Sequence, residues 1–142
     1  MKEQFIPYRE ALTLRELGFD EECFKMYSPS DNGVIVHPLN VYKGKNSSLG
    51  KEFKGYSSAP LWQQAFDWFR EKYSLFSTVD RINNVTEIGY RFNISTIKSN
   101  MVVDKFPLSR KESIYYKEYN EAKQACLEKL IEIVKNENKS DL

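Results

Sequence analysis

The sequence has few of the residues from which catalytic centres are usually built. It holds one histidine, His37, and two cysteines, Cys23 and Cys126. A Ser-His-Asp or Cys-His arrangement would have to use His37, which precedes a proline. The cysteines lie far apart and form no C-x-x-C, so we expect both to be free thiols that pack as small buried hydrophobes.

Metal-binding and nucleotide-binding motifs are also missing. No H-E-x-x-H and no paired Cys/His spacing indicates zinc, and no phosphate-binding glycine pattern indicates a nucleotide. No G-x-S-x-G surrounds a serine. We interpret the adjacent carboxylates of Asp20, Glu21 and Glu22 as a solvated connection in preference to a metal or acid–base site. The sequence therefore predicts a protein without cofactor or metal that is not an enzyme.

The chain lacks a long apolar run and an excess of charge of one sign. Its net charge is +1 although 29% of its 142 residues are charged, so no strong field draws it to nucleic acid or an anionic membrane. No apolar run is long enough to span a bilayer, and the opening MKEQFIPYRE lacks the apolar segment of a signal peptide. We expect a cytoplasmic protein that does not enter membranes.

Aromatic residues, at 14%, are plentiful, and they are densest in residues 58–75, SAPLWQQAFDWFREKYSL. Trp62, Phe66, Phe69 and Tyr73 recur at helical spacing, which predicts an amphipathic helix with its aromatic face against a sheet. Ser57 or Ser58 is the expected N-cap. An aromatic ligand cage is the alternative interpretation, but such stripes usually belong to a core.

The first part of the chain predicts a helix followed by a hairpin. The helix covers residues 7–17 and stops at Gly18. Two strands, residues 23–27 and 34–36, flank the turn SPSDNG. The second strand could continue through residues 39–42, beyond an edge proline.

The second part predicts another hairpin and a final helix. Residues 76–82 form one strand and 85–97 the next, in which apolar Ile88, Tyr90, Phe92 and Ile94 alternate with polar residues or glycine. Residues 101–103 could add a short edge strand. The final helix covers residues 118–136, unless it already begins near Arg110, where Ser109 and Glu112 form an S-x-x-E capping pattern.

Together these elements predict an α+β fold, with three helices packed on one mainly antiparallel sheet of about four to five strands. The expected order is helix, hairpin, helix, hairpin, helix. We expect a single domain over residues 1–136 and a frayed tail over 137–142. The predicted core includes Leu14, Leu17, Trp62, Phe66, Phe69, Tyr90, Phe92, Cys126, Leu130 and Ile133.

The lysine-rich loop, residues 43–56, has the sequence KGKNSSLGKEFKGY. It combines positive charge with aromatic faces, as surfaces that bind single-stranded nucleic acid do. The candidate contacts are Lys43, Lys45, Lys51, Phe53, Lys54 and Tyr56, with help from Arg110 and Lys111. Glu52 dilutes this charge, and a solvated flexible loop is the interpretation that we favour.

Three stretches, FIPYREALTLRELGFDEECF, APLWQQAFDWFREKY and YNEAKQACLEKLIEIVK, carry a resemblance. They resemble small proteins, without an assigned activity, that phages, prophages and other mobile elements of Bacteroides-like bacteria encode. The shared motifs are helix-packing patterns, so no site residues carry over. The resemblance implies a bacterial, cytosolic accessory protein of a mobile element.

Two functions remain open at this point. A non-catalytic module that binds a protein partner is our first prediction, since no catalytic constellation is present and the surface should be of mixed charge. A weak nucleic-acid-binding protein that uses the lysine-rich loop is the alternative. A homodimer is also expected, because surplus aromatic residues favour interfaces. These surplus aromatics are Tyr56, Tyr115, Tyr116 and Tyr119.

Overall fold

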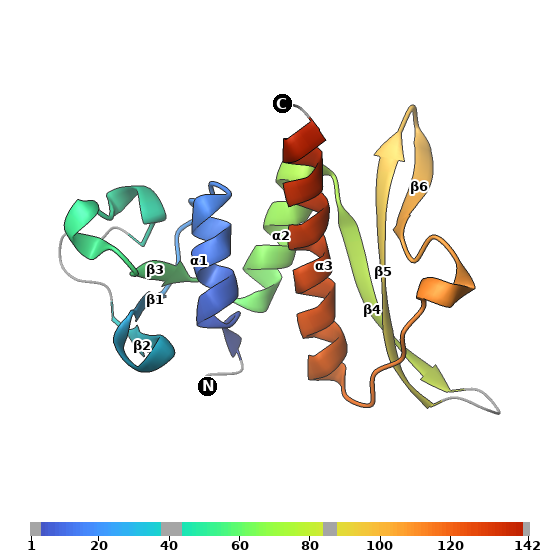
Figure 1. The fold of residues 1–142 in the computed structure, drawn as a ribbon, viewed down its shortest axis with the longest axis horizontal. Coiled ribbons are helices and arrows are strands. Elements are labelled where there is room, and N and C mark those ends of the chain that lie inside the picture. The colour runs from blue at the N-terminus through green and yellow to red at the C-terminus, as the bar shows by residue number, and fades with distance from the viewer. Residues whose placement is uncertain (1–3, 38–43, 84–87, 141–142) are drawn as a thin grey trace. The chain divides into compact units, whose positions relative to one another are not determined.

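The computed structural model describes residues 4–37, 44–83 and 88–140, without the side chains of Arg110 and Ser140 (Figure 1). The contacts of the chain gather in two compact units, residues 1–67 and 68–142, whose boundary falls inside the second helix. We predicted one domain over residues 1–136. Whether the two units unfold together as one domain stays a prediction.

The first helix, α1 (Tyr8–Glu16), forms where the sequence predicts it. Pro7 precedes the helix in an extended conformation, and Leu17 ends it. Gly18 then adopts a φ of 100°, which a residue with a side chain rarely adopts. This turn lets the amide of Phe19 donate to the carbonyl of Leu14 at 2.8 Å, and it buries the Phe19 ring.

The first unit holds a three-stranded antiparallel sheet of order β2-β1-β3. The predicted hairpin is confirmed as β1 (Lys25–Ser28) and β2 (Val34–Val36), and Asp31 and Asn32 in its turn have positive φ. The predicted continuation over residues 39–42 lies outside the described residues. The third strand, β3 (Ser57–Ala59), was not predicted.

Strand β3 corrects the prediction that Ser57 or Ser58 caps a helix. Both serines are fully buried in the strand, and the hydroxyl of Ser57 donates to the carbonyl of Ala11 in α1 at 3.1 Å. The second helix, α2 (Trp62–Tyr73), begins later. The side chain of Gln64, not a serine, accepts the amide of Leu61 at 3.0 Å.

The buried face of α2 is rotated from the predicted one. Ala65, Trp68 and Phe69 are buried, whereas Trp62 and Phe66 are half-buried and stack on each other with ring centroids 6.0 Å apart. The prediction that Trp62 and Phe66 are core residues is therefore wrong. Aromatic spacing alone did not distinguish two faces of a helix that carries large apolar residues on both.

The second unit holds an antiparallel sheet of order β4-β5-β6, formed by β4 (Phe76–Asn83), β5 (Ile88–Lys98) and β6 (Met101–Phe106). Strands β5 and β6 are joined by a two-residue turn at Ser99 and Asn100, which have φ of 50° and 63°. Two such residues are typical of a tight hairpin turn. The predicted edge strand is confirmed, and it is longer than residues 101–103.

The third helix, α3 (Tyr119–Ser140), packs against β5 and β4. It begins near the later of the two predicted starts and continues through 140, so the predicted tail is helical over 137–140. Its buried residues are Ala122, Cys126, Leu127, Leu130, Ile131 and Val134. Three further residues predicted to be core, Leu17, Tyr90 and Ile133, are half-buried.

The α+β class with three helices is confirmed, but the single sheet is wrong. The described residues form two antiparallel sheets of three strands each. The predicted order is also wrong, because β3 and β6 each add a strand before the next helix. A strand of three residues such as β3 carries no alternation from which it could be recognised.

Candidate functional site

The described part of the lysine-rich loop, residues 44–56, is anchored by a buried asparagine. Asn46 is only 7% exposed at the start of a short 3-10 helix, η3 (Asn46–Ser48). Its side-chain nitrogen donates to the carbonyl of Phe19 at 2.8 Å, and its side-chain oxygen accepts the amide of Ser58 at 2.9 Å. Both polar ends of this side chain are therefore satisfied inside the first unit.

Helix α1 holds the far end of the same loop. The hydroxyl of Tyr8 donates to the carbonyl of Gly55 at 2.7 Å. The guanidinium of Arg15 donates to the carbonyls of Phe53 and Tyr56. Tyr8 and Arg15 both belong to α1, so this helix holds the end of the loop as Asn46 holds its start.

A hollow of about 530 Å³ lies between α1 and this loop. It is lined by Leu12, Arg15, Glu16, Lys51, Lys54 and two glycines. Three cationic side chains thus meet one carboxylate, which leaves the hollow electropositive. Lys51 in this lining begins a further short 3-10 helix of the loop, η4 (Lys51–Phe53).

The predicted nucleic-acid contacts are only partly brought together. Lys45, Lys51 and Lys54 are exposed, and none of them forms an ion pair within the described part of the chain. Phe53 and Tyr56 are half-buried and meet edge to face at 5.3 Å, so their rings contact each other. Residue 43 and the side chain of residue 110 are not described, and Lys111 lies in the second unit.

Both cysteines are free and buried, as predicted. Burial raises the pKa of the Cys23 thiol to about 12, although a hydrogen bond with Ser58 opposes this shift. Burial likewise raises the pKa of Cys126 to about 12, against a hydrogen bond with Ser77. The thiolate is the nucleophilic form of cysteine, and it is scarce at neutral pH with such pKa values.

His37 is exposed, and the ammonium nitrogen of Lys25 lies 2.8 Å from its Nδ1 and 3.0 Å from its Nε2.

Within residues 4–37, 44–83 and 88–140, no three His, Cys, Asp or Glu side chains cluster so that they could hold a metal ion. None of the helices in these ranges combines the length and apolar character that a membrane span requires.

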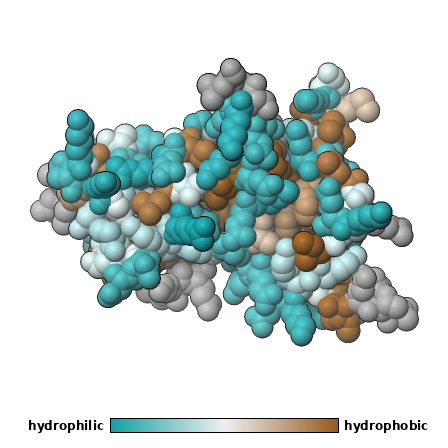
Figure 2. Space-filling view, in the orientation of Figure 1, coloured by the Kyte–Doolittle hydropathy of each residue, from teal (hydrophilic) through white to brown (hydrophobic). Residues whose placement is uncertain are grey.

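The second unit exposes an apolar surface that was not predicted. Met101 is 68% exposed, Val102 72% and Val103 38%, and all three lie at the start of β6. Ile97, directly opposite Val102 on β5, is 51% exposed. We call Ile97, Met101, Val102 and Val103 the hairpin patch. Figure 2 shows hydrophobic residues gathered along β6 on the face in view.

The hairpin patch lies on an open edge of the sheet. Strand β6 is the last in the order β4-β5-β6, and no other described strand pairs with its outer side. The closing pair of a two-residue hairpin, here Lys98 and Met101, exchanges both of its backbone hydrogen bonds. Alternation then directs the N–H and C=O groups of Val102 and Asp104 outward. An unpaired edge of this kind is a template for another strand.

The other end of β6 is protected from such pairing. The register shifts at Ile94 and Ser95, and a bulge disrupts the regular pattern of a strand. Lys105 forms an ion pair with Glu137 of α3 at 3.5 Å. Pro107 follows the strand and has no N–H to offer. Of the two ends of β6, it is therefore the start that combines exposed apolar side chains with open backbone groups.

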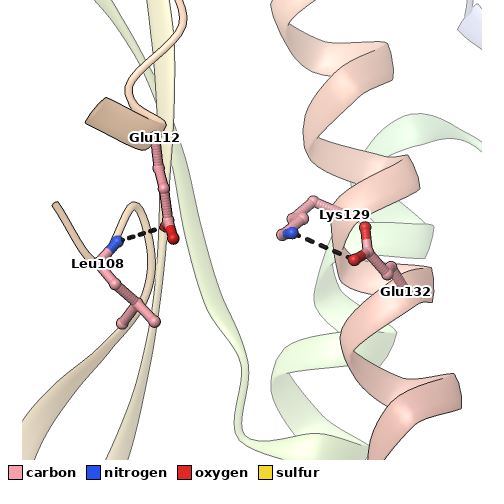
Figure 3. A network of polar contacts seen from close by, with 4 residues as sticks. All are labelled: Leu108, Glu112, Lys129 and Glu132. Carbon is pink, nitrogen blue, oxygen red and sulfur yellow. Dashed lines mark hydrogen bonds and ion pairs between the residues drawn. The ribbon is translucent and has the colours of Figure 1, made fainter. Parts of the chain in front are cut away.

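Figure 3 shows one polar contact within the segment that follows β6 and one within α3. The carboxylate of Glu112 accepts the amide of Leu108 at 2.8 Å, around a single 3-10 turn, η5 (Arg110–Glu112). Glu112 of the predicted S-x-x-E pattern thus belongs to this short turn, and the pattern does not begin the final helix. Lys129 of α3 contacts Glu132 at 3.3 Å, and its ammonium lies 4.9 Å from the centroid of the Phe106 ring.

Sequence reasoning missed the hairpin patch because apolar residues were assigned to a core by default. The available signal was the run Met101-Val102-Val103 directly after a turn, since three consecutive apolar residues in a strand cannot all face one core. The resemblance to mobile-element proteins stays a prediction. Compared with known proteins, this chain matches no protein-family model, no curated protein and no solved structure.

Proposed function

We propose that this protein is a non-catalytic module that binds a protein partner, and that its binding surface is the hairpin patch. One observation carries the proposal: Met101, Val102 and Val103 expose apolar side chains on a strand whose outer edge has no described strand partner. Contiguous apolar surface and an open sheet edge are both typical of protein-interaction sites.

A partner strand would gain two kinds of contact at this edge. Its backbone can pair with the outward N–H and C=O groups of Val102 and Asp104. Its side chains can cover the patch, and burying a Val or Met side chain completely contributes about 1.5–3 kcal/mol. We also propose that the module acts in the cytoplasm as an accessory protein of a mobile element, for which the resemblance of the three stretches is the support.

The test is a capture experiment with a matched pair of variants. The wild-type chain, Val102→Lys and Ile88→Lys are immobilised and exposed to a bacterial lysate at several salt concentrations. Ile88 is 74% exposed at the opposite end of β5, so it serves as an equally exposed apolar control. We expect a protein that wild type and Ile88→Lys retain and Val102→Lys loses. Equal retention by all three would refute the proposal.

A second candidate function is weak binding of single-stranded nucleic acid, favoured by the exposed ammonium groups of Lys45, Lys51 and Lys54. Glu16 at the hollow and Glu52 in η4 reduce the positive field, and the Phe53 and Tyr56 rings meet edge to face instead of forming an open stacking platform. These features rank nucleic-acid binding below protein binding.

Titration of fluorescent oligonucleotides at low salt tests this second function. The variant changes Lys45, Lys51 and Lys54 to Ala, and the control changes the exposed Lys98, Lys117 and Lys135 to Ala, with the same loss of charge. Binding that falls steeply with salt and is lost only in the first variant would support it. Equal loss in both variants would indicate a nonspecific charge effect and contradict it.

A further inference from the structure

We propose that the partner strand at the hairpin patch is β6 of a second copy of this chain, paired antiparallel about a two-fold axis. This inference rests on the proposed function and names the occupant of the same surface. Symmetric pairing would join the two sheets of order β4-β5-β6 edge to edge into one continuous sheet.

The outward backbone groups restrict how two β6 strands can pair. In an antiparallel ladder, residues that exchange hydrogen bonds lie directly opposite each other. The outward residues are Val102 and Asp104, so a symmetric pairing has three registers. Val102 faces Val102 of the second copy, or Val102 faces Asp104, or Asp104 faces Asp104.

Side-chain chemistry selects among the three registers. The Asp104 register places two carboxylates directly opposite each other, which is destabilising. The mixed register places each Asp104 carboxylate against a valine. The Val102 register places Val102 against Val102, and each Met101 against Val103 of the second copy. It also leaves Asp104 beside Asn100 of the second copy, whose side-chain amide can donate to a carboxylate.

The Val102 register also accounts for the extent of the hairpin patch. Ile97 lies opposite Val102 within each copy, so the two Ile97–Val102 pairs would form one apolar strip across the two-fold axis. The pairing ends where the bulge and the Lys105–Glu137 ion pair begin. The exposed apolar part of β6 is therefore complementary to itself, which is the property that a symmetric interface requires.

Sedimentation velocity on the full chain, from low to high micromolar concentration, is the first measurement. We expect a monomer–dimer equilibrium in wild type and in Ile88→Lys, and a dissociation constant at least about tenfold higher in Val102→Lys, where two lysines would face each other. Circular dichroism confirms that each variant is folded, since both positions are exposed. A dimer that Val102→Lys leaves unchanged would overturn the inference.

Cysteine crosslinking then tests the register. In the Val102 register, the two Cα atoms of Val102 should lie about 5.5 Å apart, a distance that a disulfide spans. Val103 would be offset from its own copy by two residues and lie too far away. We expect mild oxidation to link Val102→Cys into dimers faster than Val103→Cys. Faster linking of Val103→Cys would overturn the Val102 register.

Sedimentation velocity and the capture experiment together separate this inference from the proposed function. A chain that stays monomeric at high micromolar concentration, yet captures a protein that Val102→Lys loses, would overturn self-pairing and leave the protein-binding function standing. A monomer that captures nothing through this patch would overturn both. Buried Cys23 and Cys126 serve as internal controls, because their thiols should stay unlinked.

Discussion

The composition of the lysine-rich loop suggests a loosely held segment, and that of the β5–β6 hairpin suggests a buried one. The structure shows the opposite in both cases. The loop is polar and rich in glycine, yet Asn46, Tyr8 and Arg15 tie its described part to the body of the first unit. The hairpin is apolar at its end, yet it exposes Met101 and Val102. Composition thus reports the affinity of a segment for water, whereas hydrogen-bond partners and packing decide whether it is held.

We expect the largest loss of stability from substitutions in the core, and this loss is the reference for both regions. Phe69→Ala should lower the free energy of unfolding by about 3–5 kcal/mol, because the ring is fully buried. Phe66→Ala should lower it by roughly half as much, since that ring is half-buried. Urea denaturation of both variants measures the difference. Equal losses would mean that Phe66 is packed as tightly as Phe69, which would contradict the buried face of α2 seen in the structure.

Asn46→Leu should be the next most damaging change. It keeps a similar volume but leaves the carbonyl of Phe19 and the amide of Ser58 buried without their partner. Each unsatisfied group costs about 1–3 kcal/mol, so the loss for the two groups should be at least about 2 kcal/mol. Ser47→Ala is the control, because Ser47 is the next residue of the same turn but is exposed, and this change should cost far less. A loss below that of the control would mean that the loop is not anchored by Asn46.

Thiol labelling can show that the anchoring is local. The amide of Cys23 donates to the carbonyl of Gly44 in the loop at 2.7 Å, whereas Cys126 belongs to the second unit. Asn46→Leu should therefore accelerate labelling of Cys23 and leave that of Cys126 nearly unchanged. Mass spectrometry after timed exposure to a thiol reagent measures both rates, and equal acceleration would indicate global unfolding instead.

The pH dependence of labelling gives a check on the buried thiols. Because burial raises both pKa values from 9.0 to about 12, the native thiols should react slowly at pH 9 and faster as pH approaches 12. The same shifts stabilise the fold while the thiols are protonated. That stabilisation is complete below the pKa of the unfolded thiols and is lost as pH rises through the folded value.

The smallest effect on stability is expected at the hairpin patch. Val102→Lys should change the free energy of unfolding of the monomer by no more than about 0.5 kcal/mol, because the side chain is 72% exposed. Urea denaturation at low protein concentration, where the monomer prevails, measures it. A loss close to that of Asn46→Leu would show that Val102 packs within its own chain, and the contrast between the two regions would fail.

Local pattern was enough to predict the three helices and both hairpins. The reason is that helix and turn formation depend on residues within about four positions of each other, such as Pro7 and Gly18 around α1 or Asp31 and Asn32 in the first turn. The exposed lysines of the loop were likewise recognisable as a basic surface.

Only the tertiary structure decided how these elements pair and what they bury. Asn46 lies 27 positions from Phe19 and 12 from Ser58, so its anchoring role is invisible to any local window. The short strand β3, the division into two sheets and the buried face of α2 depend equally on distant partners. The exposure of Met101–Val103 follows from the same cause, because a side chain is buried only if another element covers it.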